Sequence, residues 1–150
     1  MRIMIPKTVK KPWGNELWIA DGERTPYALK RIVFNEGFRS SLQVHKYKFE
    51  TNYVLDGTGI IQIREEIFDV DAFLESGNQT DVIERVTREL VDVQVGPGDV
   101  LDVRPGQIHR VIASTQLVFI EASTCELGDV IRLSDDSGRG HGKISDEHKG

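Results

Sequence analysis

The sequence has 150 residues, of which 39% are hydrophobic and 29% charged, and these values fit one soluble globular domain spanning residues 1–150. A net charge of −5 argues against general nucleic-acid binding, because phosphate contacts need a basic face. The single cysteine, Cys125, excludes an intrachain disulfide and a cysteine metal cluster. The apolar stretch near residue 1 is too short for a signal peptide or a membrane span, so we expect a cytoplasmic protein without membrane contact.

Short runs of β-forming residues separated by turns predict about nine strands. The runs are residues 17–20, 27–34, 41–45, 51–55, 59–63, the second half of 81–95, 100–103, 108–113 and 117–122. Residues 68–76 fit one or two helical turns, and residues 81–95 fit both a helix and a strand, with β-branched content favouring a strand at the end. This spacing predicts a β-sandwich or barrel with an ordered core over about 8–134 and a polar, mobile tail over about 141–150.

Four residues in two separated blocks have the chemistry of metal ligands. Gln43 and His45 are two residues apart in a predicted strand and therefore share a face. Glu50 needs a turn at residues 46–48 to return to the same point, and His109 follows a tight Pro-Gly turn. Each residue alone is more often a surface or hydrogen-bonded side chain than a ligand. Together, two imidazoles, an amide and a carboxylate suit Zn, Mn, Fe, Co or Ni and leave positions open for catalysis.

The spacing of these residues resembles the double motif of the cupin family. The first motif is matched by Gln43, His45, Glu50 and Gly57, and the second by Gly98, Pro105, Gly106 and His109. More specifically, the chain is similar to the type II mannose-6-phosphate isomerase domain, found alone or at the C-terminus of bifunctional mannose-1-phosphate guanylyltransferases. The similar blocks are KPWGNELW, LKRIVFNEGFRSSLQVH, PGQIHRV and LGDVIRLSDDSGR, in order across residues 11–139.

The resemblance implies an all-β cupin barrel, that is, a double-stranded β-helix or jelly roll. It also implies one divalent metal, with Zn favoured, held by Gln43, His45, Glu50 and His109. The expected reaction interconverts mannose 6-phosphate and fructose 6-phosphate by proton transfer through a cis-enediol. Lys48 and Arg139 are the expected catalytic residues, and Lys48 would stabilise the enediolate or move protons. The expected substrate-binding residues are Lys30, Arg110, Arg139 and Trp13, with both arginines offered to the phosphate and Trp13 also fitting a packing role.

The chain departs from the family pattern at several positions. Tyr47, Lys48, Asn52 and Ala113 stand where the family usually has His, Arg, Trp and Asn, and residues 64–90 form a longer segment than expected. Two other classes therefore stay open: another sugar-acting cupin enzyme of epimerase or dioxygenase type, and a non-catalytic cupin that binds a sugar phosphate. An epimerase would use a His and Tyr pair without metal. Exposed barrel edges invite strand pairing between two copies, which would give a homodimer.

Overall fold

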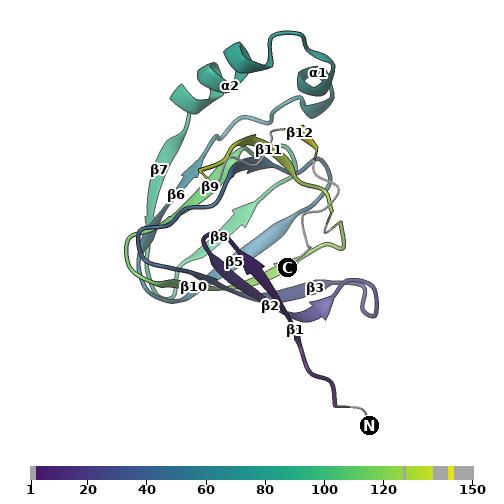
Figure 1. Cartoon of the computed structure of the whole chain (residues 1–150), viewed down its shortest axis with the longest axis vertical. Helices are drawn as coiled ribbons and strands as arrows, with labels where there is room; N and C mark the ends of the chain where they lie inside the picture. The colour runs from purple at the N-terminus through teal and green to yellow at the C-terminus, as the bar shows by residue number, and fades with distance from the viewer. Residues whose placement is uncertain (1–2, 127, 137–141, 144–150) are drawn as a thin grey trace.

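The structure is a computed structural model that describes residues 3–126, 128–136 and 142–143. These residues form two antiparallel sheets that face each other and close into a barrel (Figure 1). The strand order in the first sheet is β1 (Lys7–Lys11), β2 (Gly14–Asp21), β3 (Ala28–Phe34), β10 (Leu117–Ser123), β5 (Glu50–Asp56) and β8 (Val100–Val103). The order in the second is β12 (Gly142–Lys143), β11 (Ile131–Ser134), β4 (Leu42–Val44), β9 (His109–Ala113), β6 (Gly59–Ile63) and β7 (Val91–Val95).

All nine predicted strands are present, and the all-β prediction is confirmed. The strands β1, β11 and β12 were not predicted. The sequence of β1, KTVKK, holds one apolar residue among lysines, so it lacks the alternation that marks a half-buried strand. The ambiguous segment divides between helix α2 (Gln79–Arg88) and β7, as the β-branched residues near its end indicate. Residues 68–76 contain the short helix α1 (Val70–Glu75), which begins where the Asp69 side chain accepts a hydrogen bond from the Ala72 amide.

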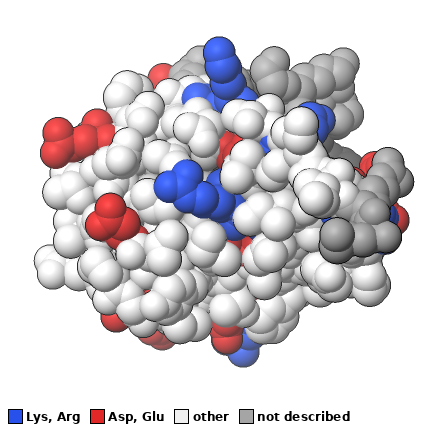
Figure 2. Space-filling view, turned by 90° about the horizontal axis from the view of Figure 1, so that it is seen from below, with Lys and Arg blue, Asp and Glu red and all other residues white. Residues whose placement is uncertain are grey.

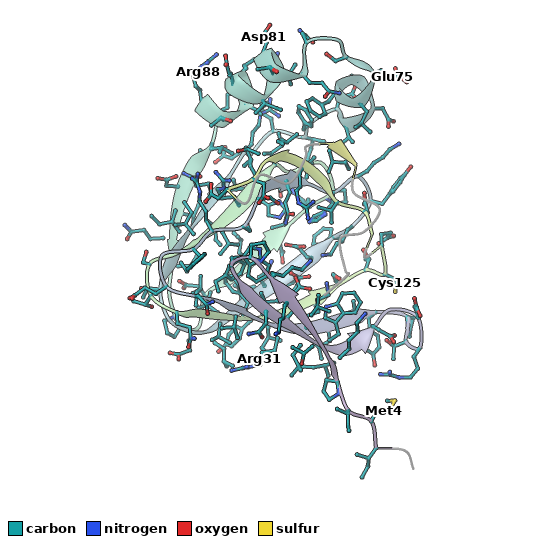
Figure 3. All side chains as sticks on the ribbon, viewed as in Figure 1. Met4, Arg31, Glu75, Asp81, Arg88 and Cys125 are labelled. Atoms are coloured by element: carbon teal, nitrogen blue, oxygen red, sulfur yellow. The ribbon has the colours of Figure 1, made fainter. Side chains whose placement is uncertain are left out.

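Two apolar clusters hold the barrel together. The larger one fills the space between the sheets and contains Trp13, Ile32, Phe34, Val54, Ile61, Ile63, Val95, Val103, Ala113, Leu117 and Phe119. The second joins the outer face of the second sheet to the helices and contains Leu42, Val44, Phe68, Val70, Phe73, Val86, Ile108, Ile131 and Leu133. The opposite sides of the helices are polar, and Glu75, Asp81 and Arg88 point away from the barrel (Figure 3). The helical segment therefore covers the outer face of one sheet, and the barrel interior holds the larger apolar cluster together with a cavity beside it.

The charged side chains are spread over the surface. On the underside of the molecule, Lys and Arg form small separate groups among uncharged residues, with acidic side chains mainly toward the edges (Figure 2). No helix among the described residues has the length and apolar character needed to cross a bilayer.

Gly57 turns the chain between β5 and β6 and is the last residue of the first motif. Its φ of +84° lies in the left-handed region, which favours glycine. A Cβ at this position would lie 1.9 Å from the carbonyl oxygen of Gln116, so a side chain cannot enter without moving the backbone. Glycine is therefore required here for two independent reasons.

We expect Gly57→Ala to lower the free energy of unfolding by more than about 2 kcal/mol, because left-handed strain and a backbone clash add. Urea unfolding followed by circular dichroism measures the change. Gly77→Ala is the matched control, since Gly77 has no positive φ and a Cβ there meets no atom within 4 Å. Equal stability of the two variants would contradict this account of the turn.

Candidate metal centre

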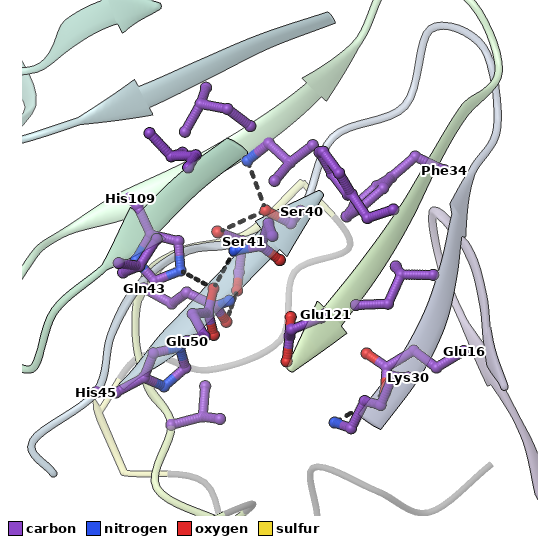
Figure 4. Close-up of a pocket in the computed structure, with 18 of the residues that line it drawn as sticks. Glu16, Lys30, Phe34, Ser40, Ser41, Gln43, His45, Glu50, His109 and Glu121 are labelled. Atoms are coloured by element: carbon purple, nitrogen blue, oxygen red, sulfur yellow. Dashed lines mark hydrogen bonds and ion pairs between the residues drawn. The ribbon is translucent and has the colours of Figure 1, made fainter. Parts of the chain in front are cut away.

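The four predicted ligands come together on the inner wall of the barrel (Figure 4). Gln43 on β4 stands directly opposite His109 on β9, and opposed residues of antiparallel strands share a face. His45 follows the end of β4, and Glu50 begins β5 after the turn at residues 46–48. The turn expected between His45 and Glu50 is therefore present and returns the carboxylate to the imidazole.

The distances within this cluster suit ligands of one ion. The Nε2 atom of His45 lies 3.5 Å from Oε2 of Glu50, and Nε2 of His109 lies 3.8 Å from Oε1 of the same carboxylate. One donor atom from each of the three residues lies within 4.8 Å of the others. His45, Glu50 and His109 are all buried, with exposed fractions of 2%, 6% and 3%.

Backbone carbonyls orient both imidazoles. His45 donates its Nδ1 hydrogen to the Asp129 carbonyl at 2.6 Å, and His109 donates its Nδ1 hydrogen to the Gln107 carbonyl at 3.0 Å. Because a carbonyl oxygen can only accept, these contacts leave the Nε2 lone pairs facing Glu50.

The His45 imidazole is left ready to bind a cation. Its Nε2 atom is buried and has no hydrogen-bond partner among the described residues. Burial, reinforced by the Lys48 ammonium, lowers the pKa of His45 to about 3, so this imidazole is neutral at pH 7. Two imidazoles whose Nε2 atoms face one carboxylate are a donor set that fits a divalent cation.

Amide side chains complete the immediate surroundings of the cluster. Gln43 lines the same cavity, and its Oε1 atom accepts a hydrogen bond from the Ser41 hydroxyl at 3.1 Å, which fixes the amide beside His109. Asn52 donates its Nδ2 hydrogen to Oε1 of Glu50 at 3.2 Å. Among the positions that depart from the family pattern, Asn52 therefore touches the cluster, whereas Tyr47 is 62% exposed and is absent from the described cavity lining.

A buried ammonium lies between two carboxylates beside the cluster. The Nζ atom of Lys48 is 3.1 Å from both Glu50 and Glu121. Burial would lower the pKa of Lys48, but Glu121 and Glu50 outweigh it and raise that pKa, so the side chain stays charged. Burial would raise the pKa of Glu50, but Lys48 and the imidazoles hold it well below its usual range. Burial, reinforced by Glu50, raises the pKa of Glu121.

A second buried ion pair lies on the neighbouring strands. The Nζ atom of Lys30 is 3.4 Å from Oε1 of Glu16 and 4.5 Å from the centre of the Trp18 ring. Both charged residues line the cavity. The other end of the cavity is apolar. There Trp13 stacks on Phe34 with ring centres 4.0 Å apart, so Trp13 both lines the cavity and packs in the core.

The cavity volume is about 70 Å³, which holds a cation and a few waters. Pockets for larger organic ligands usually enclose roughly 300–1,000 Å³. A sugar phosphate held at the cluster would therefore extend toward the mouth or widen the lining.

Of the two expected substrate-binding arginines, Arg110 is not among the described lining residues of the cavity, and Arg139 is not described. Arg110 was expected at the phosphate, and this expectation is corrected by strand alternation: it follows His109 and therefore faces the opposite side of β9. It stands there opposite Gln62 of β6, is 5% exposed, and donates its Nε hydrogen to the Ser40 carbonyl at 3.1 Å. Arg139 and the predicted tail over residues 141–150 lie outside the described residues, apart from Gly142 and Lys143.

Sequence reasoning missed three residues at or beside the site, of which Glu121 and Arg132 are buried and Asp129 is half-buried. Glu121 is a lone acidic residue inside the apolar strand LVFIEAS, which was a usable signal. Asp129 gave no signal beyond its place in a family block. Arg132 on β11 stands opposite Gln43 and is 3% exposed, so it faces the barrel interior beside a proposed ligand.

Glu50→Gln is expected to weaken Zn²⁺ binding by at least about 100-fold, because the amide removes the only charged donor of the cluster. Competition with a chromophoric chelator measures the affinity. Glu66→Gln makes the same change at a side chain that is 81% exposed and should leave binding unaltered. Unchanged affinity in folded Glu50→Gln would place the metal elsewhere.

Comparisons with solved structures support the fold. CapF from Staphylococcus aureus, a capsular polysaccharide assembling protein, is 16% identical with a TM-score of 0.60, and the match covers 86% of this chain and 34% of CapF. KdgF from Halomonas sp. is 14% identical with a TM-score of 0.58, covering 82% and 89%. An RmlC-like cupin from Shewanella frigidimarina is 13% identical with a TM-score of 0.57, covering 83% and 87%. The chain thus spans about a third of CapF, and at these identities the likeness concerns the fold alone.

No curated protein matches the sequence at a significant level. The profile of the family described as "Mannose-6-phosphate isomerase C-terminal" matches residues 2–110, a stretch that includes Gln43, His45, Glu50 and His109. With its two-sheet cupin barrel, the chain therefore belongs to the mannose-6-phosphate isomerase C-terminal family.

Proposed function

We propose that this protein is a metal-dependent aldose–ketose isomerase that interconverts mannose 6-phosphate and fructose 6-phosphate through a cis-enediol. The observation that carries the proposal is the buried cluster of His45, Glu50 and His109, with both Nε2 atoms directed at one carboxylate. Membership of the mannose-6-phosphate isomerase C-terminal family supports the choice of reaction. We place the protein in the cytoplasm, where its single cysteine would remain reduced.

The proposed ligands of one divalent cation are Gln43, His45, Glu50 and His109. Their mixed nitrogen and oxygen donors favour Zn and also accept Mn, Co, Ni or Fe. A bound cation would supply a Lewis acid that polarises the carbonyl and hydroxyl oxygens at C1 and C2 of the open-chain sugar.

Lys48 supplies fixed positive charge in this proposal. Because Glu121 and Glu50 raise its pKa, the ammonium does not release its proton near pH 7 and cannot act as the base. Of the two roles expected for Lys48, stabilisation of the enediolate is therefore favoured over proton transfer. A charge held in a buried site acts strongly on a developing anion, because little water screens it.

Glu121 is our candidate for the group that moves the proton between C1 and C2. Outside the proposed ligands, the described ionisable residues of the cavity lining are Glu16, Lys30, Lys48 and Glu121. Burial and Glu50 raise the pKa of Glu121, which makes it a stronger base than an ordinary carboxylate. By contrast, Lys30 and Lys11 outweigh the effect of burial at Glu16 and lower its pKa.

The phosphate needs cations near the mouth of the cavity. Lys30 lines the cavity, and Arg132 faces the interior beside Gln43, so these two residues replace Arg110 as candidates. Arg139 remains a proposed catalytic and phosphate-binding residue outside the described part of the chain.

A second candidate function, an epimerase with a His and Tyr pair, is disfavoured because no tyrosine is among the described lining residues.

Protein stripped of metal should not convert mannose 6-phosphate, and reloading with Zn, Mn, Co or Ni should restore turnover with at least one ion. Coupled detection of fructose 6-phosphate measures the rate. His109→Ala should lose turnover, whereas the surface variant Glu66→Gln should keep it. Saturable binding of the sugar phosphate without turnover, in folded and loaded protein, would instead identify a sugar-binding cupin.

Glu121→Gln should lower kcat by roughly 10²–10⁴-fold while metal content stays unchanged, because the amide cannot accept the substrate proton. The same variant should stop solvent deuterium from entering C1 of the fructose 6-phosphate that forms, which mass spectrometry detects. Glu66→Gln is the control, since its side chain is 81% exposed and is not among the described lining residues of the cavity. Wild-type kcat and deuterium entry in loaded Glu121→Gln would exclude this role.

A further inference from the structure

Asp129 makes four hydrogen bonds to four consecutive residues beside the metal cluster. Its Oδ1 atom accepts from the Lys46 amide at 3.0 Å, and its Oδ2 atom accepts from the amides of Tyr47 at 2.6 Å and Lys48 at 3.0 Å. Its backbone carbonyl accepts the Nδ1 hydrogen of His45 at 2.6 Å. One residue therefore holds both the turn at residues 46–48 and the imidazole that precedes it.

The turn at residues 46–48 sets the relation between two proposed ligands. His45 stands immediately before it and Glu50 shortly after it, so a displacement of the turn moves one ligand relative to the other. Unpaired amide groups in a partly buried turn cost free energy, and an ionised carboxylate satisfies such donors with strong, short hydrogen bonds. The Asp129 carboxylate thus stabilises one backbone path through the turn.

A second contact fixes His45 from the other side. Its backbone carbonyl accepts from the amide of Gly106 at 2.7 Å, in the Pro-Gly turn that leads to His109. The main chain of His45 is thereby tied to the segment that carries the other imidazole. The remaining freedom of the His45 ring is rotation, and the Asp129 carbonyl restricts it by accepting from Nδ1.

We propose that Asp129 is a positioning residue of the metal site. Its carboxylate holds the turn in place, and this keeps its own carbonyl in line with His45 Nδ1, so that Nε2 faces Glu50. The inference rests on the proposed metal site but not on the isomerase reaction. Loss of a group that orients a metal-binding histidine typically lowers metal affinity by about 10–100-fold.

Two substitutions test this role by removing different parts of the Asp129 carboxylate. Asp129→Ala removes both carboxylate oxygens and therefore all three side-chain hydrogen bonds to the turn. Asp129→Asn keeps one oxygen that can accept from Tyr47 and Lys48, but directs an amide hydrogen toward the Lys46 amide. Asp21→Ala is the matched control, because Oδ1 of Asp21 also accepts two turn amides, from Glu23 and Arg24 at 2.9 Å each, away from the cavity.

The measurements are Co²⁺ affinity by titration and the visible absorption spectrum of bound Co²⁺, which reports ligand geometry. We expect both Asp129 variants to bind Co²⁺ about 10–100-fold more weakly, with Asp129→Asn less affected, and to show altered spectra. Asp21→Ala should match the wild type in both. If Asp129→Ala fails to fold, Asp129→Asn decides.

Wild-type affinity and spectrum in either folded Asp129 variant would overturn the inference. Co²⁺ binding by the wild type without any isomerase turnover would remove the proposed reaction and leave the role of Asp129 standing. Failure of the wild type to bind Co²⁺ at all would remove the metal site and this inference together.

Discussion

The site depends on one buried positive charge, the ammonium of Lys48. Two carboxylates that face each other inside a protein cannot both stay ionised unless a cation lies close to them. Lys48 contacts Glu50 and Glu121 at the same distance of 3.1 Å, and beside it the pKa values of the two carboxyl groups differ. Glu50 stays ionised and can serve as a ligand, whereas Glu121 keeps a raised pKa. One lysine thus allows a proposed ligand and a proposed proton acceptor to occupy neighbouring strands.

Much of the site could be predicted because strand geometry is periodic. Residues two apart in a strand share a face, which places Gln43 and His45 together. Glu50 is an odd number of residues after His45, so a turn between them was needed to bring its carboxylate back to the same point. The contacts of Glu121 and Asp129 could not be predicted, because their partners are 73 and more than 80 residues away in the chain. The error at Arg110 was avoidable, since neighbours on a strand point to opposite faces.

The comparisons show that the barrel fold and the residues of the site have to be considered separately when a reaction is assigned. A capsular polysaccharide assembling protein and an RmlC-like cupin both match this fold at 13–16% identity, so the barrel alone does not select a reaction. The family match covers residues 2–110 and therefore all four proposed ligands and Lys48. Glu121 and Asp129 lie beyond it. The proposed acid–base group and the clamp on the turn are thus properties of this chain that its structure, rather than the family match, brings forward.

The position of Asp129 has a consequence for biosynthesis. All four proposed ligands precede residue 110 in the sequence. Strand β10, which pairs with both β3 and β5, comes after them, and Asp129 comes after β10. A ribosome therefore exposes all four residues before β10, which pairs with the strand that carries Glu50, and before the Asp129 carboxylate, which accepts the turn amides of residues 46–48. A nascent chain could meet metal ions while it holds the right donors in the wrong geometry. Selective loading would then begin only when the barrel closes.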